Sequence, residues 1–132
     1  MSLHPNTRVQ SFRYALRGIR VMLAEESNAR LHAAATIAVV AAGFAFGISR
    51  GEWLAIILSI SLVGCAEGLN TAFESLCDVA SPQFHPKVER AKDIAAGAVL
   101  IAAAGAGAVG LFVFGPPLLA LVLALIAGTS GP

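Results

Sequence analysis

The chain has 132 residues, of which 57% are hydrophobic and only 13% are charged. Its mean hydropathy of +0.77 is far above that of an ordinary soluble domain of this length. This composition excludes a soluble globular enzyme and predicts an integral membrane protein. The net charge of +1 carries no further information, and we expect no nucleic-acid partner.

The first predicted element is an amphipathic helix. Apolar side chains recur at helical spacing between residues 11 and 26, and arginines lie between them. This pattern is typical of a helix that lies on a membrane surface, so we expect a surface helix over about residues 8–28. The charged residues of this segment precede the first apolar run, which therefore does not resemble a cleaved signal sequence.

Three apolar stretches follow the surface helix. No charged side chain interrupts residues 33–49, residues 53–66 or the sequence from residue 94 onwards. About 20 apolar residues are enough to cross a bilayer, so three spanning helices are the economical number. We therefore predict an all-α integral membrane protein, formed by a single domain over residues 1–132.

The expected spans cover about residues 30–48, 52–80 and 90–114. The turn Gly47-Ile-Ser-Arg-Gly51 is long enough only to link antiparallel neighbours. Proline disfavours helix in the residue before it, so Ser81-Pro82 is expected to end the second span. The hydrophobic tail of residues 115–132 begins with Gly-Pro-Pro, and either extends the third span after a kink or lies at the interface.

Basic residues indicate how the chain is oriented. In a three-span topology, the N-terminal region and residues 77–93 share one side of the membrane and hold eight of the nine basic residues. Only Arg50 lies on the other side. Because cytoplasmic segments next to spans are enriched in Lys and Arg, this distribution predicts that the shared side is cytoplasmic.

Four polar side chains occupy one face of the second span near its predicted cytoplasmic end. At 3.6 residues per turn they fall on one narrow stripe, so they would point at a single site. Ionisable groups at this depth are unfavourable and usually functional. Carboxylate and amide oxygens suit Mg²⁺ that is held by one or two carboxylates together with substrate phosphates. We call these residues the polar stripe: Glu67, Asn70, Glu74 and Asp78.

Two further polar clusters lie on the same predicted side. In the segment 25–32, just before the first span, Glu26 and Arg30 are spaced to pair at i,i+4 on a helix. In the segment 87–93, at the start of the third span, basic groups could hold phosphate oxygens. Each cluster also has a structural explanation, as an interfacial ion pair or as charges that anchor a helix. His32 and His85 lack metal-ligand spacing, which favours a solvated or capping role for both.

The polar stripe must be shielded from lipid. Three thin helices do not enclose a deep aqueous pocket by themselves. A homo-oligomer with sites between subunits would provide the shielding. We favour it over a monomeric bundle, in which the stripe would face the first and third spans.

Together these residues carry a family resemblance. The polar stripe belongs to the pattern Glu67-xx-Asn70-Thr-Ala-x-Glu74-xxx-Asp78, which is followed by Ala91-Lys92-Asp93-xx-Ala96-Gly97-Ala98-Val99. This combination resembles the signature of the prokaryotic diacylglycerol kinase and undecaprenol kinase family of small membrane enzymes. The upstream segments also match in order and spacing: Arg17-Gly18-Ile-Arg20 and Glu26-x-Asn28-x-Arg30-x-His32. The resemblance extends from about Phe12 to Phe114, and the tail beyond Gly115 departs from it.

The resemblance implies a homotrimer of three-span subunits with a surface helix, which transfers the terminal phosphate of ATP to a lipid hydroxyl. It implies that Glu67 is the catalytic base and that Glu26 and Glu74 hold a magnesium ion bridging the ATP phosphates. Lys92 and Asp93, together with Glu26 and Glu74, would contact the nucleotide. Arg17 is a weaker candidate for a phosphate or lipid contact. The residues expected to position the substrate or support the site are Asn28, Arg30, Asn70 and Asp78.

The same resemblance bears on the lipid substrate. Leu31 and His32 stand where the diacylglycerol-type enzymes tend to be more polar or acidic, which is similar to the undecaprenol kinase branch. This likeness favours undecaprenol, with diacylglycerol as the alternative, at the cytoplasmic face of a bacterial inner membrane. A membrane protein whose buried carboxylates relay protons or bind a cation is the alternative of another class. That alternative leaves unexplained why Glu26, Lys92 and Asp93 gather at one membrane surface.

Overall fold

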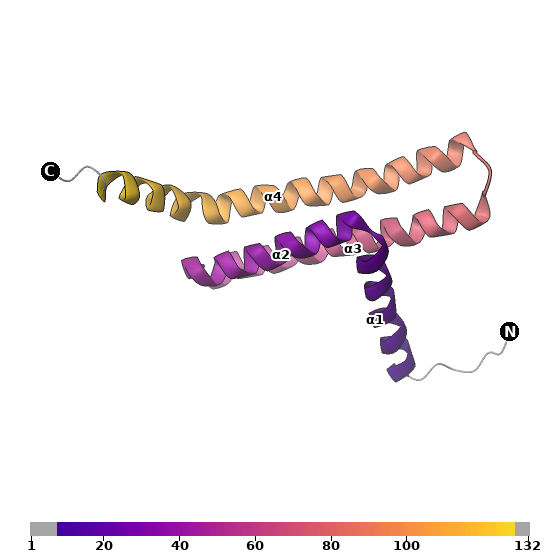
Figure 1. Ribbon diagram of the computed structural model, residues 1–132, viewed down its shortest axis with the longest axis horizontal. Helices are drawn as coiled ribbons and strands as arrows, with labels where there is room; N and C mark the ends of the chain where they lie inside the picture. Colours follow the sequence, from indigo (N-terminus) through magenta and orange to yellow (C-terminus); the bar gives the residue numbers. More distant parts are fainter. Residues whose placement is uncertain (1–7, 129–132) are drawn as a thin grey trace.

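The computed structural model describes residues 8–128, and its regular secondary structure in this range is helical. Helix α1 covers Arg8–Glu25, α2 covers Ser27–Phe46, α3 covers Arg50–Ala80 and α4 covers Pro86–Gly128. By length and composition, α2, α3 and α4 are apolar enough to cross a membrane, which confirms the predicted all-α membrane architecture. Figure 1 shows these three helices lying lengthwise beside one another, with α1 projecting steeply from the start of α2.

The corner between α1 and α2 is formed at a single residue. Glu26 has an extended backbone, with φ −97° and ψ 122°, and is the N-cap residue of α2. Arg30 Nη1 donates to the carbonyl oxygens of Ala24 at 3.0 Å and of Leu23 at 3.4 Å. Carbonyls at the C-terminal end of a helix lack partners within it and carry partial negative charge. Arg30 therefore fastens the corner between the two helices.

The ion pair between Glu26 and Arg30 that the sequence spacing predicts does not form. The i,i+4 argument requires one continuous helix, whereas the extended residue at position 26 turns the chain between two helices. The guanidinium group of Arg30 is instead bonded to carbonyls of α1. Within residues 8–128 the ion pair that does form joins Lys92 to Asp78.

Two caps build the turn between α2 and α3. Gly47 ends α2 in the left-handed conformation, with φ 63°, which glycine adopts without a steric penalty. The Ser49 hydroxyl accepts from the Glu52 N–H at 3.3 Å, while the Glu52 carboxylate accepts from the Ser49 N–H at 2.7 Å. This reciprocal capping box satisfies donors at the start of α3 and returns the chain antiparallel to α2.

The apolar core lies at the hairpin end of the helices. Ile56, Val113 and Phe114 are buried together, and the ring centroids of Phe46 and Phe114 lie 6.3 Å apart. This core joins α2, α3 and α4. Helix α3 packs far more extensively against α4 than against α2, so the α3–α4 pair forms the main helix–helix contact of the fold.

Packing at Gly43 leads to a stability prediction. A Cβ atom at this position would lie 2.7 Å from a ring atom of Trp53 and 3.2 Å from the Ile48 side chain. We expect Gly43→Ala to lower the free energy of unfolding by about 1–3 kcal/mol, because the indole ring must move. A Cβ at Gly51 would meet nothing within 4 Å, so Gly51→Ala is the matched control. Thermal unfolding in detergent micelles measures both, and equal melting temperatures would contradict the packing argument.

Helix α4 continues into the C-terminal tail, so that of the two alternatives the sequence leaves open, the tail extends the third span. In place of a span over about residues 90–114, the helix begins at Pro86 and continues to Gly128, with Pro116 and Pro117 inside it. A proline inside a helix removes the hydrogen bond to the carbonyl four residues earlier, and its ring crowds that carbonyl. In apolar surroundings a helix remains the best way to pair the other backbone groups. Figure 1 shows the C-terminal part of α4 extending past the α2–α3 hairpin.

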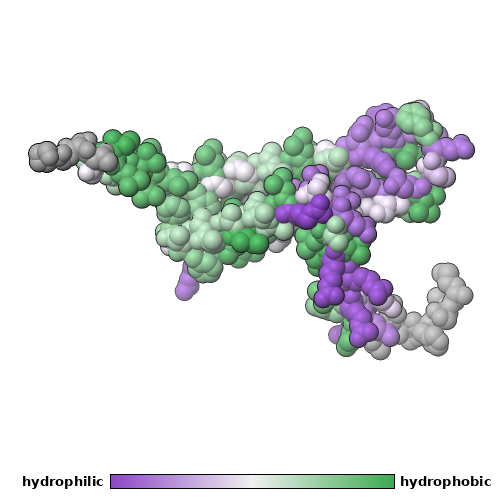
Figure 2. Space-filling view, viewed as in Figure 1, coloured by the Kyte–Doolittle hydropathy of each residue, from purple (hydrophilic) through white to green (hydrophobic). Residues whose placement is uncertain are grey.

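Hydrophilic residues gather at the opposite end of the molecule. Figure 2 shows hydrophilic surface over α1 and over the corner between α3 and α4, while the rest of this face is mostly hydrophobic. This end contains the start of α2, the last turns of α3 and the first turns of α4. The polar stripe lies on those last turns of α3.

Candidate active site

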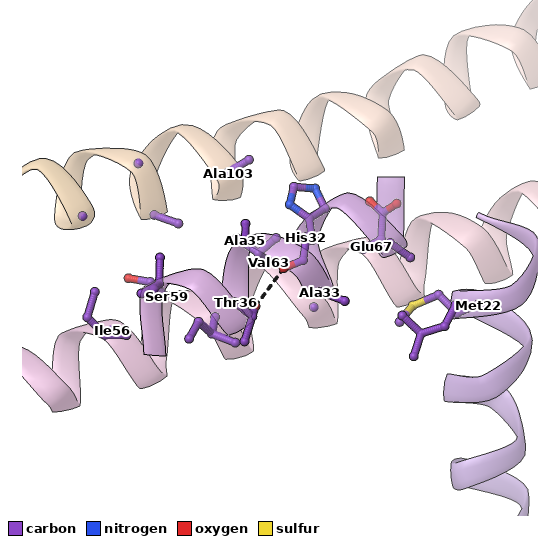
Figure 3. Close-up of a pocket in the computed structure, with 18 of the residues that line it drawn as sticks. Met22, His32, Ala33, Ala35, Thr36, Ile56, Ser59, Val63, Glu67 and Ala103 are labelled. Atoms are coloured by element: carbon purple, nitrogen blue, oxygen red, sulfur yellow. Dashed lines mark hydrogen bonds between the residues drawn. The ribbon is translucent and has the colours of Figure 1, made fainter. Parts of the chain in front are cut away.

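A cavity of about 440 Å³ lies between the four helices. Most of its wall is aliphatic, and α4 contributes only Ala103, Ala106, Gly107 and Gly110. These small side chains leave room beside α3, since a Cβ atom at either glycine would meet nothing within 4 Å. Figure 3 shows the cavity running along α2 and α3 towards the end of α1.

Glu67 lies in the wall of this cavity. Only 3% of its surface is exposed, and it is the buried charged residue of the part of the chain that the structure describes. Figure 3 shows its carboxylate and the imidazole of His32 on the side of the cavity that faces α4. Helix α1 lies close to α3 at Gly68, the residue after Glu67: a Cβ atom at Gly68 would lie 3.6 Å from Met22 Sδ. A carboxylate in an apolar wall is unfavourable for stability, which indicates a functional role.

The following turn of α3 holds a hydrogen-bonded pair. Asn70 Nδ2 donates to Glu74 Oε1 at 2.8 Å, and both residues are half-buried. The Asn70 Oδ1 atom is buried and accepts no hydrogen bond from any residue that the structure describes. A buried acceptor of this kind is normally satisfied by a ligand, an ion or water. An amide oxygen beside a carboxylate suits Mg²⁺, so Asn70 and Glu74 have the chemistry to contribute ligands to the predicted magnesium site.

Lys92 and Asp78 form an ion pair across the α3–α4 corner. Lys92 Nζ lies 2.5 Å from Asp78 Oδ1, and the two side chains are 33% and 69% exposed. Ion pairs as accessible as this contribute little to stability, because solvent screens the two charges. The pair therefore serves mainly to hold the Lys92 ammonium group beside the outer end of the polar stripe.

A single chain does not bring all the predicted residues together. Asp78 lies about three helical turns along α3 from Glu67, and Lys92 of α4 is paired with Asp78. Glu26 lies at the α1–α2 corner, and its neighbours Leu23 and Ala29 line the cavity. Among residues 8–128 no three His, Cys, Asp or Glu side chains converge as a metal site. The predicted residues that the structure leaves exposed are Arg17, Asn28, Arg30, Asp78 and Asp93.

His32 lines the cavity although the sequence spacing favours a solvated or capping role for it. It is half-buried on the face of α2 that also carries Ala29, Ala33 and Thr36. These positions follow the i, i+3, i+4, i+7 spacing of one helix face. The periodicity of α2 was therefore the signal that could have placed His32 on the face of α2 that lines the cavity.

Known proteins with similar sequences identify the family. The prokaryotic diacylglycerol kinase family matches residues 13–114. The chain is 41% identical over 113 residues to the undecaprenol kinase of Bacillus subtilis, an overlap that covers 86% of this chain and 92% of that protein. It is 40% identical over 120 residues to the diacylglycerol kinase of Synechocystis sp., covering 90% of this chain and 68% of that protein. The chain therefore belongs to the prokaryotic diacylglycerol kinase family, as the residue pattern around the polar stripe predicts.

Proposed function

We propose that the protein is an ATP-dependent lipid kinase that transfers the γ-phosphate to the hydroxyl of undecaprenol. The observation that carries this proposal is the buried Glu67 in the wall of an apolar cavity, one turn from the Asn70–Glu74 pair. The apolar cavity suits a lipid chain, and the oxygen-rich turn suits the phosphate end of the reaction. The identity to the undecaprenol kinase of Bacillus subtilis supports this choice of alcohol.

The reaction needs a base, because a lipid alcohol is a poor nucleophile. The Glu67 carboxylate accepts the hydroxyl proton while the alcohol oxygen bonds to the γ-phosphorus and the bond to the leaving ADP oxygen breaks. Its place in the cavity wall lets the lipid keep its chain in apolar surroundings while its hydroxyl reaches the base. No part of the lipid has to be transferred into water.

Negative charge on the ATP phosphates must be neutralised. Glu26 and Glu74 would hold Mg²⁺, and the unpaired amide oxygen of Asn70, the hydrogen-bond partner of Glu74, would be a further ligand. The bound ion would supply positive charge to the phosphate oxygens. Lys92 and Asp93 would contact the nucleotide, with Asp78 holding the Lys92 ammonium group in place. The remaining proposed roles are phosphate or lipid contact for Arg17 and substrate positioning for Asn28 and Arg30.

We further propose a homotrimer whose sites face the cytoplasm from a bacterial inner membrane. Arg17, Asn28 and Asp93 are exposed in one chain. In a trimer, exposed polar residues of one subunit would complete the site around Glu74 of its neighbour. The concentration of basic residues at this end supports the cytoplasmic orientation.

An activity assay tests the proposal. Purified protein in mixed micelles is incubated with labelled ATP, magnesium and either undecaprenol or diacylglycerol, and the labelled lipid is quantified. We expect magnesium-dependent labelling of undecaprenol that disappears when the metal is chelated. Preferential labelling of diacylglycerol would instead support the alternative product, phosphatidic acid, which the identity to the Synechocystis diacylglycerol kinase makes the second candidate.

Folded protein that labels neither alcohol would remove the kinase proposal. The buried Glu67 would then support the alternative of a membrane protein that relays protons or binds a cation. A proton-flux measurement in liposomes, with Glu67→Gln as the negative control, tests that alternative directly.

A further inference from the structure

The cavity beside Glu67 offers almost no hydrogen-bond donor to a bound molecule. Apart from Glu67, its wall has three residues with polar side chains: His32, Thr36 and Ser59. The Thr36 hydroxyl donates to the His32 carbonyl oxygen at 2.8 Å, and the Ser59 hydroxyl donates to the Ala55 carbonyl oxygen at 2.8 Å. Both hydroxyl protons are therefore engaged within their own helices. The ring N–H of His32 remains as the side-chain donor of this wall.

His32 lies on the side of the cavity where the hydroxyl of a bound lipid would react. Its imidazole and the Glu67 carboxylate lie on the same side of the cavity, facing α4 (Figure 3). The rest of the cavity extends along α2 and α3, away from Glu67, between aliphatic side chains and the small residues of α4. A lipid whose hydroxyl reaches Glu67 therefore meets His32 at its polar end and a donor-free wall along its chain.

The two candidate lipids differ in the number of hydrogen-bond acceptors that they would bring into the cavity. A polyprenol has one hydroxyl followed by branched hydrocarbon, whereas diacylglycerol carries two ester groups close to its hydroxyl. An ester carbonyl that enters an apolar cavity without a donor loses its hydrogen bonds to water, which is unfavourable. The cavity volume of about 440 Å³ accommodates roughly 15 non-hydrogen atoms at ~30 Å³ each, or about three isoprene units.

We propose that this cavity binds the hydroxyl-bearing end of a polyprenol, that His32 hydrogen-bonds the lipid hydroxyl beside Glu67, and that the donor-free wall selects against diacylglycerol. This inference rests on the proposed kinase function and adds a substrate-binding residue and a basis for lipid specificity. The imidazole orients the hydroxyl oxygen, and Glu67 receives its proton. His32 thereby acts on the lipid and leaves nucleotide binding unaffected.

Substitutions at position 32 separate a role in substrate binding from a structural one. His32→Leu removes the donor, and we expect kcat/KM for undecaprenol to fall by about tenfold or more, with the KM for magnesium-ATP unchanged. His32→Gln retains an N–H donor and should keep kcat/KM within about threefold of the parent value. Melting temperatures in detergent, measured for all three proteins, identify any loss that comes from folding.

A second pair of variants tests the place of the lipid chain. Ala106→Leu fills the cavity, whereas Ala104→Leu adds the same side chain at an exposed position of α4 that does not line it. We expect Ala106→Leu to raise the KM for undecaprenol by about tenfold, with Ala104→Leu close to the parent. Undecaprenol should also raise the melting temperature of the parent and of Ala104→Leu, and should raise that of Ala106→Leu by less at the same lipid concentration.

The outcomes distinguish this inference from the proposed function. A parent protein that phosphorylates neither lipid overturns the proposed function and the inference with it. A parent that is active but prefers diacylglycerol overturns the inference alone. The inference also fails if His32→Leu keeps the parental kcat/KM on undecaprenol, or if His32→Gln is as impaired as His32→Leu while both remain folded.

Discussion

Replacing Glu67 with glutamine is expected to reduce phosphate transfer by at least about a hundredfold, because the amide keeps the shape of the side chain but cannot accept the hydroxyl proton. Glu67 is buried and is the carboxylate that lines the apolar cavity. The nucleotide contacts are proposed for other residues, so magnesium-ATP should bind Glu67→Gln as it binds the parent. Single-turnover transfer from labelled ATP to undecaprenol, with equilibrium nucleotide binding on the same preparation, measures both quantities.

A matched control is available at the end of α1. Glu25→Gln makes the same chemical change on an exposed carboxylate at the hydrophilic end of the protein, and we expect it to retain transfer. If Glu67→Gln transferred phosphate as fast as the parent, Glu67 would not be the base. If Glu67→Gln and Glu25→Gln were equally impaired, the loss would reflect the charge of this region and not proton transfer at one position.

Glu74→Gln is expected to weaken magnesium-dependent nucleotide binding by about 10–100-fold, the range typical for loss of a group that supports a metal site. The glutamine oxygen can still accept the Asn70 Nδ2–H that Glu74 Oε1 accepts at 2.8 Å, so the local structure should persist. The substitution removes the negative charge that attracts the cation. Titration of a fluorescent ATP analogue, with and without magnesium, measures the effect.

Together the two substitutions assign different roles to neighbouring turns of α3. Glu67→Gln should lose transfer and keep binding, whereas Glu74→Gln should lose magnesium-dependent binding first. A Glu74 variant with parental magnesium-dependent affinity would exclude this carboxylate from the metal site. The reverse pattern, with binding lost at position 67 and transfer lost at position 74, would exchange the two roles.

Local properties of the sequence account for much of the fold. Hydropathy over runs of about 20 residues requires α2, α3 and α4 to lie in a membrane, because unpaired backbone groups are not tolerated there and a helix pairs them all. Helical periodicity alone places Asn70 and Glu74 on one face, and the structure joins them by a hydrogen bond. The polar stripe was predictable because it lies within a single continuous helix.

Features that depend on how two helices meet were harder to predict from the sequence. Glu26 has an extended backbone and turns the chain between α1 and α2, which the sequence pattern does not show. Because of this turn, Arg30 donates to carbonyls at the end of α1 and does not pair with Glu26. The continuation of α4 beyond Pro116 and Pro117 follows from an apolar environment that local proline rules do not include. His32 has no motif of its own, and its importance arises from facing the same cavity as Glu67.

The sequence by itself determined the membrane class, the number of long helices and the carboxylates of α3, since hydropathy and a repeat of 3.6 residues are properties of each segment alone. The tertiary structure decided which side chains share the cavity, because that depends on the angle between α1 and α2 and on how closely the small residues of α4 allow it to approach α3. The environments of Glu67, His32 and Arg30 belong to this second group. Each is set by atoms contributed from another helix.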